Sequence, residues 1–201
     1  MIKNVVFDFG QVLIHFEPSY IVSGFVTDPD DAELLESVLF DRFYWDQLDA
    51  GTISNDEILA HCSSRLPDRL HGVAREIMYG WIHRLPEMEG MNALVKDLKS
   101  QYGVKLFLLS NISVYFAEHA SEFPVLSYMD GCVFSGVCKK VKPTVEIYAH
   151  LCETYGLDPA ETVFVDDNAA NIAAAREFGI TGYLFDGDSE KLRVYLSERL
   201  K

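Results

Sequence analysis

Five short apolar runs constrain the fold of this chain more than any other feature of its sequence. Each consists mainly of Val, Leu, Ile and Phe, and none alternates regularly with polar residues. Runs of this kind are typical of parallel strands that are covered on both faces. They lie at residues 4–9, 104–110, 131–134, 162–165 and 181–185, and helix-like segments lie at residues 90–102, 143–155, 168–178 and 189–200.

From residue 90 onward, strand-like and helix-like segments follow one another along the chain. This order implies right-handed crossovers, with helices on both faces of one sheet. We therefore predict an α/β fold with a doubly wound, Rossmann-like, mainly parallel sheet.

The stretch between the first and second apolar runs has a different pattern. Residues 17–85 show helical periodicity and no convincing strand, and Ser54 with Glu57 three residues later forms a capping-box pattern, which marks the start of a helix. We therefore predict two units. An α/β core comprises residues 1–16 and 86–201, and a small all-helical cap, residues 17–85, is inserted after the first strand.

The chain is acidic, with 31 Asp and Glu residues against 17 Lys and Arg and a formal net charge of −14. Nucleic acids and anionic membranes attract basic surfaces, so we expect neither as a partner. No apolar stretch approaches the roughly 20 residues that span a bilayer. The four cysteines form no CxxC pair, the histidines lack the spacing of zinc ligands, and no secretory leader precedes the first apolar run. We expect a cytoplasmic protein that is a monomer or a weak dimer.

Polar residues follow three of the predicted strands. Asp8 ends the first run, Ser110 and Asn111 end the second, and Asp166 and Asp167 follow the fourth. The carboxyl ends of parallel strands share one edge of the sheet, where ligands bind. One aspartate could cap the helix that follows, but two beside Asp8 would repel one another without a cation. Since oxygen ligands suit Mg²⁺, the pattern predicts a magnesium site.

Lys142 and Asn171 complete this set. Lys142 precedes Pro143, which we place at the first position of the helix 143–155, and it lies in a small cluster of lysines within an acidic chain. An ammonium group there can neutralise a phosphate. Asn171 lies one helical turn beyond the aspartate pair. Together, these groups suit displacement at phosphorus through an aspartyl-phosphate.

Four motifs occur in the order FDFGQVL, LLSN, VKP and FVDDNAANI. In this order the chain resembles the haloacid dehalogenase superfamily over essentially its whole length. The phrase LDAGTISNDEI resembles a cap segment of the helical-cap subclass. Within that subclass, the sequence is most similar to bacterial phosphatases of the α-glucose-1-phosphate type and to the phosphatase domain of bifunctional epoxide hydrolases.

The resemblance implies a role for each residue of the first motifs. Asp8 would be the nucleophile and a Mg²⁺ ligand, the backbone carbonyl of Gly10 a second ligand, and Asp167 a third. Ser110 and Asn111 would bind the transferring phosphoryl group.

It also implies roles for the residues that support them. Lys142 would bind the phosphoryl group and take part in catalysis. Asp166 would be an outer metal ligand or a partner for Lys142, and Asn171 would have a supporting role.

Position 10 departs from the family pattern. Phosphatases of the superfamily commonly carry an aspartate two residues after the nucleophile, which serves as general acid and base, whereas this chain has Gly10. Such help is worth about 10²–10⁴-fold in rate. A leaving group of low pKa would need less help, Gln11 or His15 could order a water, or the protein could be a weakly active binder of phosphorylated ligands.

We therefore expect a Mg²⁺-dependent phosphatase that acts on a small phosphorylated metabolite, with sugar phosphates as the favoured class. The alternative is a metal-independent 2-haloacid dehalogenase, which needs an arginine for the substrate carboxylate. Arg42 is the only early candidate, and the pair Asp166 and Asp167 disfavours that function. The aromatic residues of the cap are expected to form its core, with one or two facing the cleft: Phe40, Phe43, Tyr44 and Trp45.

Overall fold

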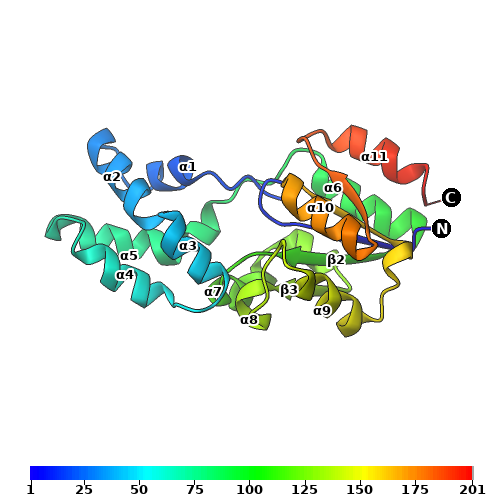
Figure 1. Cartoon of the computed structure of the whole chain (residues 1–201). Helices are drawn as coiled ribbons and strands as arrows, with labels where there is room; N and C mark the ends of the chain where they lie inside the picture. Colours follow the sequence, from blue (N-terminus) through cyan, green and yellow to red (C-terminus); the bar gives the residue numbers. More distant parts are fainter. Residues whose placement is uncertain (201) are drawn as a thin grey trace.

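A wholly parallel, five-stranded sheet forms the centre of the computed structural model, which describes residues 1–200 (Figure 1). The strand order is β3-β2-β1-β4-β5, and all four neighbouring pairs are parallel. This confirms the predicted doubly wound α/β fold. The strands are β1 (Asn4–Phe7), β2 (Lys105–Ser110), β3 (Gly131–Phe134), β4 (Thr162–Asp166) and β5 (Thr181–Leu184).

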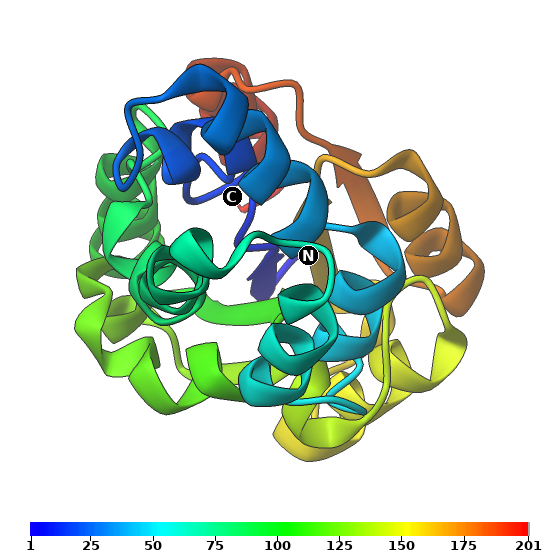
Figure 2. The ribbon, with the colours of Figure 1, turned by 90° about the vertical axis from the view of Figure 1, so that its left-hand side faces the viewer.

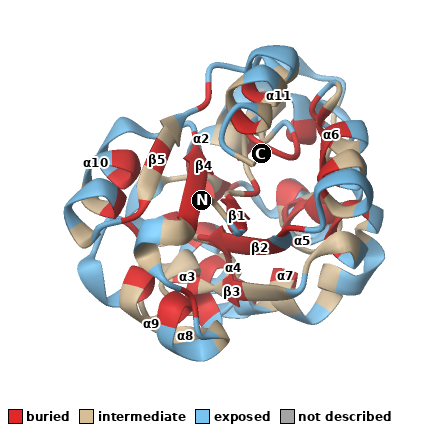
Figure 3. Cartoon of the chain, turned by 90° about the vertical axis from the view of Figure 1, so that its right-hand side faces the viewer, coloured by how far each residue is buried: buried red, intermediate tan, exposed pale blue. Residues whose placement is uncertain are grey.

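Successive residues of β1 face opposite layers of the core. Val5 packs in the cluster that includes α6 (Met91–Asp97), α7 (Val114–His119) and α11 (Ser189–Ser197). Val6 packs in the cluster that includes α9 (Val145–Tyr155) and α10 (Ala169–Phe178). Both faces of β1 are therefore dry, which explains its unbroken apolar sequence (Figure 3).

Helices α1 to α5 lie together beyond one end of the sheet, and Figure 2 views them from that side. Ser54 and Glu57 form the predicted capping box at the start of α4. The division into a core and a cap at the predicted boundaries stays a prediction. The elements of this stretch are α1 (Pro18–Ser23), α2 (Pro29–Leu39), α3 (Arg42–Asp49), α4 (Asn55–Ser63), η1 (Asp68–Leu70), α5 (His71–Gly80) and η2 (Trp81–Arg84).

The structure differs from the predicted boundaries at the end of the first strand and at the start of the helix after Pro143. The first strand ends at Phe7 rather than at residue 9, because the chain turns back and the Phe9 carbonyl accepts hydrogen bonds from Leu13 and Ile14. The helix predicted at 143–155 begins at Val145, so Pro143 is not its first residue. The Lys142–Pro143 peptide bond is cis, and a turn closed by Thr144 N–H on the Val141 carbonyl precedes the helix.

Two other helices are shorter in the structure than predicted, and several short helices were not predicted. The helix predicted at 90–102 is α6 followed by a π-helical turn, η3 (Leu98–Tyr102), and the C-terminal helix stops at Ser197. No helix of residues 1–200 is long and apolar enough to cross a membrane. Five short helices were not predicted: α7, α8 (Ser135–Cys138), η4 (Ala120–Glu122), η5 (Pro124–Tyr128) and η6 (Pro159–Glu161).

Candidate active site

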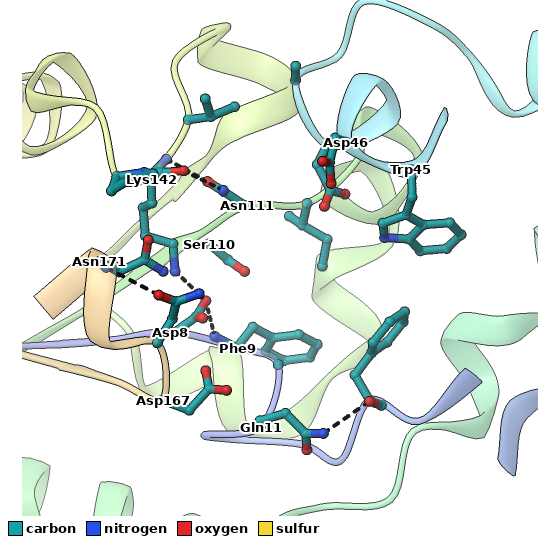
Figure 4. Close-up of a pocket in the computed structure, with 18 of the residues that line it drawn as sticks. Asp8, Phe9, Gln11, Trp45, Asp46, Ser110, Asn111, Lys142, Asp167 and Asn171 are labelled. Atoms are coloured by element: carbon teal, nitrogen blue, oxygen red, sulfur yellow. Dashed lines mark hydrogen bonds and ion pairs between the residues drawn. The ribbon is translucent and has the colours of Figure 1, made fainter. Parts of the chain in front are cut away.

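A cavity of about 540 Å³ opens where the carboxyl ends of the strands meet the helical insert. Asp8 directly follows β1, Ser110 ends β2 and Asp166 ends β4, so the parallel topology brings their side chains to one edge of the sheet. The loop ahead of α9 adds Lys142 (Figure 4). The predicted residues that line the cavity are Asp8, Gly10, Ser110, Asn111, Lys142, Asp167 and Asn171.

Lys142 lies between two carboxylates at the floor of this cavity. Its Nζ is 2.8 Å from Asp8 Oδ1 and 2.7 Å from Asp166 Oδ2, and its side chain is 1 % exposed. Burial alone lowers the pKa of the Lys142 amine, but the two carboxylates outweigh burial and the pKa lies above its ordinary value. The amine is therefore a fixed positive charge beside Asp8.

Asp8 keeps one oxygen free for chemistry. Oδ1 accepts from Lys142 and, at 2.7 Å, from the backbone N–H of Phe9. No hydrogen bond to Oδ2 joins it to residues 1–200. Burial raises the pKa of Asp8 to about 6, because desolvation and the nearby Asp166 outweigh Lys142.

Asp166 is fully buried and its oxygens are occupied. Beside Lys142, they accept from Asn168 N–H at 2.7 Å and from Asn171 Nδ2 at 3.0 and 3.1 Å. The helix cap is a different residue, since the Asn168 side chain accepts from Ala170 and Asn171 N–H at the start of α10. Asp166 therefore holds Lys142, and Asn171 holds Asp166.

Asn111 is tied to the backbone of Lys142. Its Nδ2 donates to the Lys142 carbonyl at 3.0 Å, and its Oδ1 accepts from the Lys142 N–H at 2.8 Å. The side chain thus fixes the lysine loop. Ser110 differs, because no hydrogen bond joins its hydroxyl to the described part of the chain, and it lies toward Asp8 in the pocket (Figure 4).

Three carboxylates are close enough to share a cation. One oxygen each of Asp8, Asp166 and Asp167 lie within 4.8 Å of one another. Asp167 is exposed, and partial desolvation and the charge of Asp166 raise its pKa. An oxygen-only donor set in which like charges crowd fits Mg²⁺. With Asp166 occupied by Lys142 and Asn171, the free donors are Asp8 Oδ2 and Asp167, beside the backbone at Gly10.

Gln11 and His15, the two residues that could order a water in place of a carboxylate at position 10, lie in different surroundings. Gln11, at φ 56°, donates its side-chain amide to the Phe16 carbonyl at 3.1 Å. His15 is exposed and is not among the residues that line the cavity. The structure therefore does not bring His15 to the site, whereas Gln11 lines the cavity with its side-chain amide held by Phe16.

Three aromatic residues close one side of the cavity, among them Trp45, one of the cap aromatics of which one or two are predicted to face the cleft. Phe16, Trp45 and Trp81 form an aromatic wall, with ring centroids 5.6–5.8 Å apart. Trp45 is thus both a core residue and a wall of the cavity, whereas Phe43 is 70 % exposed.

Helix α3 also brings charged groups to the cavity. Arg42 lines it and pairs with Asp46 at 2.7 Å, and Asp49 lines it at the end of the helix. The signal for Asp49 was present in the sequence, because it belongs to the phrase LDAGTISNDEI that resembles a cap segment.

Comparison with known proteins identifies the family. A family model described as haloacid dehalogenase-like hydrolase matches residues 2–179. The chain belongs to this hydrolase family. This confirms the predicted superfamily, and the matched region includes every residue of the site.

Several relatives of this hydrolase are phosphatases. D-ribitol-5-phosphate phosphatase of Bacteroides thetaiotaomicron is 28% identical over 188 residues, covering 89% of each chain. A sesquiterpene phosphatase of Aspergillus oryzae is 28% identical over 187 residues, covering 90% of this chain and 88% of that one. A solved haloacid dehalogenase family enzyme of Bacteroides thetaiotaomicron, a variant in complex with magnesium and inorganic phosphate, has a TM-score of 0.73 at 22% identity. That match covers 96% of this chain and 99% of that one.

Proposed function

We propose that this hydrolase is a Mg²⁺-dependent phosphatase that transfers the phosphoryl group of a small metabolite to Asp8. The observation that carries the proposal is the buried Lys142 between Asp8 and Asp166, with Asp8 lining the cavity and its Oδ2 without a hydrogen bond to residues 1–200. The phosphatase relatives support it.

The residues divide the work of phosphoryl transfer among them. Asp8 Oδ2 attacks phosphorus, while Lys142 neutralises negative charge at the floor of the site and Ser110 donates to a phosphoryl oxygen. Asp166 and Asn111 position Lys142 through the contacts described above. Asp8, the Gly10 carbonyl and Asp167 would hold Mg²⁺, which supplies charge neutralisation and orientation of the phosphate.

The shape of the cavity favours a small leaving group of mixed character. Its volume of about 540 Å³ suits a metabolite. The aromatic wall offers faces on which the apolar side of a sugar or polyol can pack, and α3 also lines the cavity with Arg42, Asp46 and Asp49. A sugar or polyol phosphate is therefore the favoured substrate class, in line with the ribitol-phosphate relative.

The test is phosphate release from a panel of sugar, polyol and isoprenoid monophosphates, with Mg²⁺ and with a chelator. We expect turnover that needs Mg²⁺ and is lost in Asp8→Asn, with Asp30→Asn, an exposed aspartate outside the cavity, as the matched control. Acid-quenched single turnovers should trap phosphate on Asp8. Turnover that survives chelation or Asp8→Asn would contradict the proposal.

One observation bears on the dehalogenase alternative. Arg42 lines the cavity, as that function would require, but its guanidinium pairs with Asp46 and its side chain is 80 % exposed. The crowded carboxylates around Asp8 also repel the carboxylate of a haloacid. Halide release from a 2-haloacid in the presence of chelator would revive the alternative. Specific binding of phosphate esters without any turnover would instead support a weakly active ligand-binding protein.

A further inference from the structure

The site lacks an obvious proton donor for the leaving group on the β1 side. Gly10 has no side chain, Gln11 is hydrogen-bonded to Phe16, and His15 lies away from the cavity. Lys142 is held by two carboxylates and keeps its proton. A phosphatase with these residues around its nucleophile needs a general acid from another wall of the cavity to protonate the leaving oxygen.

Helix α3 ends at such a group. Asp49 lines the cavity that Asp8 and Lys142 line, and its side chain forms no hydrogen bond or ion pair with residues 1–200. Its backbone carbonyl accepts from Ser135 Oγ at 2.5 Å, which docks the end of α3 onto α8. Asp46, one turn earlier on the same helix, is instead paired with Arg42 and 58 % exposed.

The surroundings of Asp49 favour its protonated form. Desolvation is the main cause of a pKa well above the ordinary value. The charges that face it are Arg42 and Lys142, which lower the pKa, and Asp46 and Asp8, which raise it. A raised pKa is the shift that suits a general acid.

We propose that Asp49 of the insert is the general acid and base of this phosphatase and replaces the carboxylate absent at position 10. The inference rests on the proposed function. It places the proton donor on the helical side of the cavity and the nucleophile on the sheet side, so the two meet across the substrate.

The proton and bond changes balance over two steps. As Asp8 Oδ2 forms a bond to phosphorus, the bond from phosphorus to the leaving oxygen breaks, and the Asp49 proton passes to that oxygen to give the alcohol. The Asp49 carboxylate then takes a proton from water as the water oxygen attacks phosphorus. The bond from phosphorus to Asp8 breaks, phosphate leaves, and Asp49 is protonated again.

The geometry at position 10 supplies a rescue experiment. A Cβ added to Gly10 would lie 3.8 Å from Phe16 Cβ, an ordinary contact, and the backbone there needs no glycine conformation. Gly10→Asp should therefore fold and place a carboxylate on the opposite wall of the cavity.

The experiment compares Asp49→Asn with Asp46→Asn on two esters, with Mg²⁺ present. An alkyl phosphate from the active panel needs protonation of its leaving oxygen, whereas 4-nitrophenyl phosphate needs little. We expect Asp49→Asn to lower kcat/KM for the alkyl ester by about 10²–10⁴-fold. For the nitrophenyl ester it should leave a burst of nitrophenol followed by slow turnover, because the base for the second step is missing.

Further readouts separate proton transfer from positioning. Asp49→Asn should abolish the fall of kcat/KM at high pH for the alkyl ester, and Gly10→Asp in the Asp49→Asn background should restore part of the rate. Asp46→Asn should change kcat/KM by the same factor for both esters. The role of Asp49 would be overturned, and the proposed function left intact, if Asp49→Asn lost kcat/KM equally on both esters without a burst. Full activity of Asp49→Asn beside an active wild type would have the same meaning. A wild type that hydrolyses no ester would overturn the proposed function itself.

Discussion

At the scale of single residues, the site depends on how charge is distributed around Lys142. Two carboxylates within 2.8 Å neutralise one buried amine and leave one negative charge near it. Removing one partner of a buried ion pair leaves an uncompensated charge, which costs far more than the loss of an exposed pair. We therefore expect Lys142 to contribute to stability as well as to the proposed catalysis.

Lys142→Met should abolish phosphatase activity and lower the free energy of unfolding by about 3–5 kcal/mol. The matched control is Lys99→Met. Lys99 pairs with Asp130 at 2.6 Å but is 37 % exposed, so its loss should cost only ~0–1 kcal/mol. Urea unfolding of both variants measures the difference, and equal effects would contradict the structural role of Lys142.

Replacing Asp49 should stabilise the folded protein, by an amount that depends on pH. A carboxyl whose pKa is raised by folding is harder to ionise in the folded state, so it destabilises the protein above its unfolded pKa of about 3.9 and has no effect below it. Asp49→Asn should therefore raise the melting temperature of the metal-free protein at pH 7, and the gain should vanish as the pH falls toward 4. Asp46→Asn, which breaks an exposed ion pair, should give no gain at pH 7.

Among the elements, the contact between α3 and α8 positions Asp49, the proposed general acid. Ser135 donates to the Asp49 carbonyl and Lys139 donates to the Gly51 carbonyl, so the end of α3 is fixed against the sheet side. Gly51 has φ 66°, and a Cβ there would lie 2.1 Å from the Gly136 carbonyl oxygen. Only glycine permits this approach.

Gly51→Ala should push α3 away from α8, lower the melting temperature and reduce kcat/KM for the alkyl ester, because Asp49 moves with the helix. Gly72→Ala is the control, since nothing lies within 4 Å of a Cβ at that position, which is outside the cavity. Thermal unfolding and the two-ester assay measure both effects. A fully stable and active Gly51→Ala protein would show that the close approach is dispensable.

At the scale of the whole molecule, one hydrophobic cluster runs from the sheet into the helical insert. It joins Val5 and Leu106 of the sheet to Leu35 and Ile77 of the insert. The site lies where the two parts meet, so ligands that bind there should stabilise both. The expectation of a monomer or weak dimer stays a prediction, which sedimentation velocity would test.

Mg²⁺ should raise the melting temperature of the whole chain. At a concentration 100 times its dissociation constant, it should add about 2.7 kcal/mol to the free energy of unfolding. The net charge of −14 means that any salt screens self-repulsion, so NaCl at matched ionic strength is the control. Asp167→Asn should weaken the effect of Mg²⁺ without weakening that of NaCl. An equal response to both salts would contradict a metal site at Asp8 and Asp167.

The parallel sheet and the identity of the residues at its carboxyl edge could be predicted from the amino-acid sequence alone. Unbroken apolar runs require cover on both faces, and parallel strands must bring Asp8, Ser110 and Asp166 to one side. Those inferences need only local periodicity and topology. The start of the helix after Pro143 and the segment around α7 were not predicted correctly. Turns and short helices there follow from tertiary contacts, which local periodicity does not report.

Only the tertiary structure decided which polar groups are occupied and which are free. The side chain of Asn111, a residue predicted to bind phosphate, is engaged with the backbone of Lys142. Asp46 and Asp49 lie three residues apart in the sequence, yet one is paired and exposed while the other is withdrawn into the cavity. The difference arises from how α3 packs against α8, a long-range contact that no local pattern in the sequence encodes.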